Sequence, residues 1–132
     1  MQLISAQDTT PADALLLANS DDVLALAAEV KRAPVVVLNF PKWTDGRAYS
    51  QAVLLRGRLR YTGEIRAAGD VLVDMLPLLR RCGFDAVQLR ADQSLETAER
   101  TLGILPGPIP AFPGHYQGDI TGARPVFAHP LA

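Results

Sequence analysis

The stretch Val35-Val36-Val37-Leu38-Asn39-Phe40 decides the fold of this chain. It is β-branched and almost continuously apolar, which is typical of a strand covered on both faces inside a parallel sheet. Pro34 stands directly before it and stops any helix that arrives from the N-terminal side. The segment therefore predicts a central strand, and the rest of the chain is interpreted outward from it.

On both sides of this strand, short apolar runs alternate with helical periodicity. Strands are predicted at residues 14–18, 35–40, 64–67 and 86–90. Helices are predicted to follow them at about residues 20–32, 46–60, 70–82 and 94–102. Ser20, Asp70 and Ser94 are placed to cap helices, and Gly83 is placed to end one. Pro77 lies inside the third helical pattern and is expected to kink it or to loosen its bond to Val73.

Four strand–helix units predict the α/β class, with a mostly parallel sheet flanked by helices. An alternative is half of an eightfold (βα) barrel, which could pair in a homo-oligomer. The 132 residues suit a single domain, with a core at about 14–102 and an irregular Pro/Gly-rich arm at 103–132. The arm is expected to pack on its own domain or on a neighbouring subunit through Phe112, Tyr116 and Phe127.

Composition excludes several classes of protein. With 48% apolar and 20% charged residues, the chain is neither disordered nor built for a membrane, and a cytoplasmic protein is expected. Cys82 stands alone, so no internal disulfide or paired-thiol redox site is expected. His115 and His129 both lie in the arm, so no metal site is predicted. The dinucleotide, phosphate-loop and zinc-protease motifs are all absent, so no cofactor is implied by motif.

Charge is unevenly distributed although the net charge is −1. Residues 31–66 hold eight basic side chains against only Asp45 and Glu64. In a nearly neutral protein such a window indicates a local anion site or a docking face rather than nucleic-acid binding. The simpler alternative is a set of solvated helix faces.

The expected site lies beyond the carboxyl ends of the strands, where parallel α/β sheets bind their ligands. The candidate residues for anion or partner binding are Lys42, Trp43, Asp45, Arg47, Tyr49, Arg66, Asp70 and Arg90. Lys42, Arg47 and Arg66, with the amides of two helix starts, could hold a small oxyanion. Against this, Asp45 and Asp70 could cap those helices, and the arginines could pair with them. Trp43 could anchor its loop on the core, and Tyr49 could point into the cleft or pack.

Three strings of sequence carry a resemblance to a known family: Phe40 to Ala52 (F-P-K-W-T-D-G-R-A-Y-S-Q-A), Gly63 to Leu72 and Leu79 to Ala86. Over about Ala14 to Gln117 the chain resembles the bacterial family called domain of unknown function 934. Members are commonly labelled probable oxidoreductases involved in sulfite reduction, a label that looks to rest on neighbouring genes.

That resemblance implies an accessory protein of sulfite reduction, which binds a small oxyanion or sulfite reductase or a related sulfur-assimilation enzyme. A cofactor-dependent oxidoreductase of the same pathway is the first alternative. A βα-type metabolic enzyme unrelated to sulfite is the second, and it rests on fold analogy alone.

Overall fold

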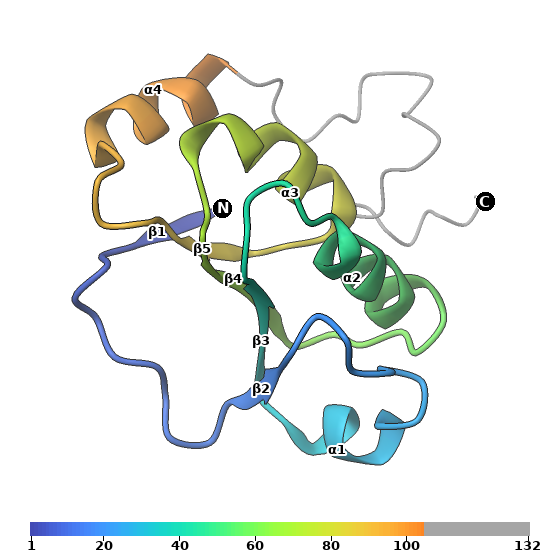
Figure 1. Ribbon diagram of the computed structural model, residues 1–132. Helices are drawn as coiled ribbons and strands as arrows, with labels where there is room; N and C mark the ends of the chain where they lie inside the picture. The colour runs from blue at the N-terminus through green and yellow to red at the C-terminus, as the bar shows by residue number, and fades with distance from the viewer. Residues whose placement is uncertain (105–132) are drawn as a thin grey trace.

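Five parallel strands form a single sheet in the computed structural model, which describes residues 1–104 (Figure 1). Their order across the sheet is β1-β5-β4-β3-β2. The strands are β1 (Gln2–Ile4), β2 (Leu15–Leu17), β3 (Val35–Phe40), β4 (Glu64–Gly69) and β5 (Ala86–Gln88). The predicted α/β class and parallel sheet are confirmed, and β3 has the predicted bounds. Strand β1 was not predicted from the sequence.

From β2 onward, a helical segment follows each strand. They are α1 (Ala27–Arg32), α2 (Arg47–Gly57), the 3-10 turn η1 (Val73–Met75), α3 (Leu76–Cys82) and α4 (Leu95–Ile104). From β2 to β5 every crossover moves one strand in the same direction, so right-handed connections place the helices on the same face. Figure 1 shows α2 and α3 on one side of the sheet, while the segment between β1 and β2 runs along the other.

One apolar core joins this sheet face to all four α-helices. The sheet contributes fully buried side chains from three neighbouring strands: Val36, Leu38, Ile65, Ala67 and Val87. The helices contribute others: Val30 from α1, Ala52 and Leu55 from α2, Leu76 and Leu79 from α3, and Ala98 from α4. The helical stripes predicted from periodicity therefore face the core, as an amphipathic helix requires.

Two helix starts differ from the prediction. Ser20 caps no helix, because Asp21 and Asp22 bind the amides of Ala18 and Leu24 in turns and α1 begins only at Ala27. Asp70 is not a cap either, because the following helical segment begins at η1 and its first amide, that of Val73, donates to Gln93.

Pro77 does not kink a helix. The predicted helix over 70–82 is divided into η1 and α3, and Pro77 lies in the first turn of α3, where its missing N–H is not needed. Two local signals are confirmed. Gly83 ends α3 with φ 106°, and the Ser94 hydroxyl accepts the amide of Thr97 at the start of α4.

The predicted C-terminal arm, with Phe112, Tyr116 and Phe127, lies outside the described residues. Within residues 1–104, no helix has both the length and the apolar character that a bilayer crossing requires.

Candidate functional site

The carboxyl ends of the five parallel strands meet at one edge of the sheet, which we call the carboxyl rim. An aspartate follows every strand at this rim: Asp8, the pair Asp21 and Asp22, Asp45, Asp70 and Asp92. Lys42, Arg47 and Arg90 are the basic residues of the same loops. The rim therefore carries an excess of negative charge, which opposes rather than favours an oxyanion.

Asp70 joins the loops that follow three neighbouring strands. Its Oδ1 accepts from Arg90 Nη1 at 2.6 Å, and its Oδ2 accepts from the backbone N–H of Trp43 at 2.8 Å. Arg90 also forms a two-bond pair with Asp92, at 2.7 and 2.9 Å. The hydrogen bond from Arg90, followed by that from the Trp43 amide, holds the pKa of Asp70 below its usual value. The candidate side chains Asp70 and Arg90 are thus bonded to each other and to neighbouring residues of the rim.

Asp45 and Arg47 form a second closed pair at the start of α2. Arg47 donates Nε and Nη2 to the two carboxylate oxygens, and its own backbone N–H also donates to Oδ1 at 3.1 Å. Asn19 adds a bond to Oδ2 at 2.7 Å from the loop after β2. These bonds, with the Arg47 side chain foremost, lower the pKa of Asp45 to about 2. The carboxylate therefore occupies the amide that an oxyanion would need.

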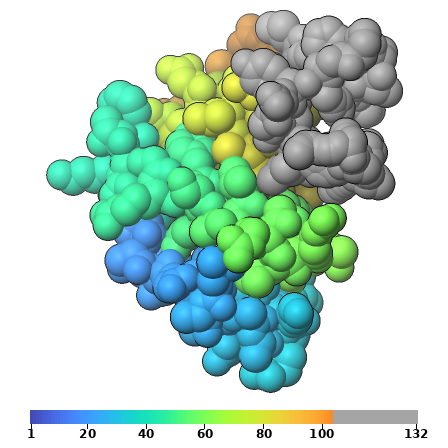
Figure 2. Space-filling model, turned by 90° about the vertical axis from the view of Figure 1, so that its right-hand side faces the viewer, coloured from blue at the N-terminus to red at the C-terminus, as the bar shows by residue number. Residues whose placement is uncertain are grey.

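Lys42 and Trp43 remain outside these pairs. Trp43 is 53% exposed, so it does not anchor its loop on the core. Lys42 is also exposed, and its side chain makes no hydrogen bond or ion pair with the part of the chain that the structure describes. Figure 2 shows the segment after β3, in teal, projecting from one side of the molecule. A cation and an indole are thus presented on a loop whose backbone is held by Asp70.

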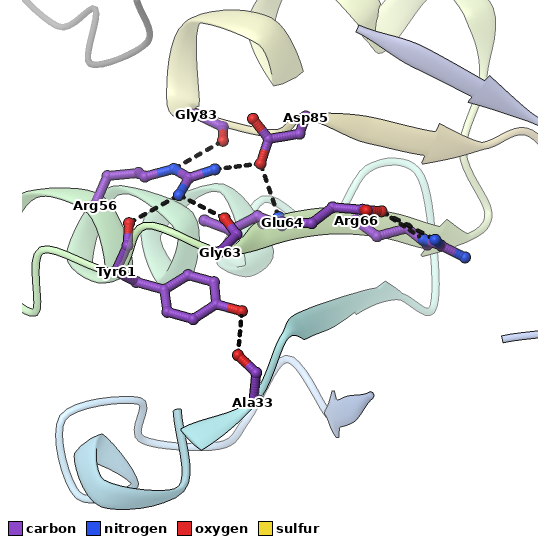
Figure 3. Close-up of polar contacts among 9 residues, drawn as sticks. Ala33, Arg56, Tyr61, Gly63, Glu64, Arg66, Gly83 and Asp85 are labelled. Carbon is purple, nitrogen blue, oxygen red and sulfur yellow. Dashed lines mark hydrogen bonds and ion pairs between the residues drawn. The ribbon is translucent and has the colours of Figure 1, made fainter. Parts of the chain in front are cut away.

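Tyr49 and Arg66 are not part of this arrangement. Tyr49 is half-buried against Phe40, with ring centroids 5.1 Å apart, and burial raises the pKa of its hydroxyl. Arg66 lies mid-strand in β4, buried and paired with Glu64 at 2.9 Å toward the start of the strand (Figure 3). The expected grouping of Lys42, Arg47 and Arg66 around one oxyanion is therefore not assembled.

Gln51 is a rim residue that sequence reasoning missed. It is only 5% exposed, and its Nε2 donates to the carbonyls of Ala18 and Asp21, which fastens α2 to the loop after β2. Its Oε1 is buried without a partner in the described residues. Helical spacing was the signal that could have found it, because Gln51 lies three positions after Ala48 and four before Leu55, on the buried face of α2. Its two carbonyl partners are revealed only by the packing of α2 against that loop.

No group of three or more His, Cys, Asp or Glu side chains suited to a metal exists among residues 1–104. A family model described as "Bacterial protein of unknown function (DUF934)" matches residues 14–127. No curated protein and no solved structure matches the chain.

Proposed function

The chain belongs to this family, DUF934, and from that premise we propose that it is a cytoplasmic accessory protein of bacterial sulfite reduction. Its role is to dock on sulfite reductase, or on a related sulfur-assimilation enzyme, through the loop that carries Lys42 and Trp43. The link to sulfite comes from the label attached to family members, and the choice of docking over catalysis comes from the rim.

The exposed indole of Trp43 is the observation that carries the proposal. Tryptophan is among the residues that contribute most to protein–protein binding, because a rigid ring loses little entropy when it is buried. Asp70 holds the Trp43 amide, so the backbone of the docking loop is ordered before a partner arrives. The adjacent Lys42 supplies a charge that can steer a partner.

The state of the other rim residues also favours docking. Arg47 and Arg90 are neutralised by Asp45, Asp70 and Asp92, and an aspartate already occupies the first amide of α2. A small oxyanion would have to displace these carboxylates. A partner protein needs only the projecting side chains.

The test measures the affinity of the purified chain for sulfite reductase holoenzyme by interferometry. Trp43→Ala is expected to weaken binding by about tenfold or more, as for an interface anchor. The matched control is Leu95→Ala, which removes another exposed apolar side chain from α4. Equal affinities of Trp43→Ala and wild type would overturn the docking role. Flavin or haem absorbance in the purified protein would instead favour the oxidoreductase alternative.

A further inference from the structure

The opposite edge of the sheet, where the strands begin, carries the opposite charge. Helices in this fold run back toward that edge, so their last turns gather there. These turns and the loops after them hold Lys31, Arg32, Arg56, Arg58, Arg60, Arg80 and Arg81. The acidic side chains Glu64 and Asp85 lie at this edge too, but each is engaged by an arginine. The basic window seen in the sequence is therefore largely a feature of this edge.

Two of these basic segments lie side by side. The Tyr61 hydroxyl donates to the carbonyl of Ala33 at 2.8 Å, and the Glu64 amide donates to that of Pro34 at 3.2 Å. These bonds hold the loop after α2 against the end of α1. Figure 2 shows this loop, in green, next to α1, in cyan, away from the projecting segment after β3.

Arg56 makes the loop after α2 rigid. Its Nη1 donates to the carbonyls of Tyr61 and Gly63, both at 2.8 Å, and its Nε donates to that of Gly83 at 3.1 Å (Figure 3). An ion pair with Asp85 completes the set. The Arg56 guanidinium is thus fully engaged within the fold, and its contacts fix the backbone that carries Arg58 and Arg60.

Four cations remain exposed on the adjoining segments: Lys31, Arg32, Arg58 and Arg60. Their side chains form no hydrogen bond or ion pair with other residues of the described range 1–104. We call these four residues the basic surface. Exposed Glu29, in the first turn of α1, is the nearest acid in sequence, and it offsets only one of the four charges.

Arg60 has a backbone conformation that a side chain disfavours. Its φ is +55°, and it is the only non-glycine residue with positive φ in the described part of the chain. The next amide, that of Tyr61, closes the end of α2 by donating to the carbonyl of Leu55 at 2.9 Å. Glycine is the usual residue at such a helix end. A strained arginine in its place points to a use for the cation itself.

We propose that the basic surface docks an acidic surface of a partner protein. This inference is independent of the proposed function, because it concerns the opposite edge of the sheet. Nucleic acid is disfavoured, since the chain has a net charge of −1 and an isoelectric point near 6.1. A second copy of the chain is disfavoured as a partner as well. Its acidic carboxyl rim would bind the basic surface head to tail, and copies joined head to tail form a closed assembly only if the rotation between them permits a ring.

The test measures binding of a fluorescein-labelled oligoglutamate peptide by anisotropy, with the full chain. Arg58→Ala and Arg60→Gly are each expected to weaken binding about two- to fivefold, the range for one exposed charge pair. Higher salt should weaken binding to the wild type. The matched control is Arg100→Ala, which removes one exposed charge from α4.

Arg60→Gly also separates docking from folding. Because glycine relieves the backbone strain, this variant should melt a few degrees higher than the wild type while binding the peptide more weakly. A lower melting temperature would assign the Arg60 side chain to structure and overturn the proposal. So would an equal loss of binding in Arg100→Ala, tighter binding of short duplex DNA than of the peptide, or self-association of the chain through this surface.

Discussion

The carboxylate of Asp70 accepts the backbone N–H of Trp43 at 2.8 Å, across 27 positions of sequence. The same carboxylate binds Arg90, so a single side chain after β4 holds together the loops that follow β3 and β5. The exposed Trp43 is therefore presented by a contact that no local sequence signal specifies.

Replacing Asp70 with alanine should release this loop. The Trp43 amide and the Arg90 guanidinium both lose an acceptor, and we expect a loss of about 1–2 kcal/mol in the free energy of unfolding. Since Trp43 is the only tryptophan of the chain, its fluorescence reports the effect directly. Steady-state anisotropy of the indole should fall. Asp74→Ala, which removes an exposed acid nearby in sequence, serves as the control, and equal anisotropy in both variants would contradict the bracing role of Asp70.

Asp45 should make the protein sensitive to acid. Its pKa is lowered to about 2 in the folded state from 3.8, so its contribution is present above about pH 4 and is lost as the pH falls toward 2. In Asp45→Asn the urea midpoint should therefore fall less steeply between pH 5 and about pH 2 than in the wild type. Parallel curves for the two proteins would show that the pair with Arg47 adds nothing to stability.

Arg56 should be the most sensitive arginine for stability. Its guanidinium donates to three carbonyls at the edge of the sheet where the strands begin, and its side chain is almost fully buried. We expect Arg56→Ala to cost about 2–4 kcal/mol of unfolding free energy in urea titrations. Lysine should restore only part, because a single ammonium cannot reproduce the planar fork. Exposed Arg58→Ala is the control, expected within about 0.5 kcal/mol of the wild type.

Two glycine substitutions should have opposite signs. At Gly69, with φ +100°, an added Cβ would lie 2.5 Å from the Phe40 carbonyl oxygen, so Gly69→Ala should destabilise by more than about 1 kcal/mol. At Gly57, within α2, an added Cβ meets nothing within 4 Å, and Gly57→Ala should stabilise by roughly 0.5–1 kcal/mol. The melting temperatures of the two variants, compared with that of the wild type, test these opposite signs. Destabilisation by both would mean that α2 needs glycine at its end.

Residues within a few positions of one another determined much of the fold. The β-branched run at 35–40 predicted β3 with its correct bounds, because a continuous apolar segment must be covered on both faces. The Ser94 cap and the Gly83 stop were likewise predicted, since each depends on amides or carbonyls in the adjoining turn. The three-residue strand β1 was missed, because Gln2–Ile4 becomes a strand only by pairing with β5.

The long-range partners of the polar side chains were decided by the tertiary structure, whereas pairs two residues apart, such as Asp45 with Arg47, are local. Asp70 has the local pattern of a helix cap, yet its carboxylate binds groups 20 and 27 residues away that the parallel sheet brings to the same edge. Arg56 and Gln51 lie on α2 and were not predicted to be buried, but neighbouring loops close over both. A backbone conformation depends mostly on nearby residues, whereas a distant partner can bind a charged or amide side chain only where the packed chain places the two within hydrogen-bonding distance.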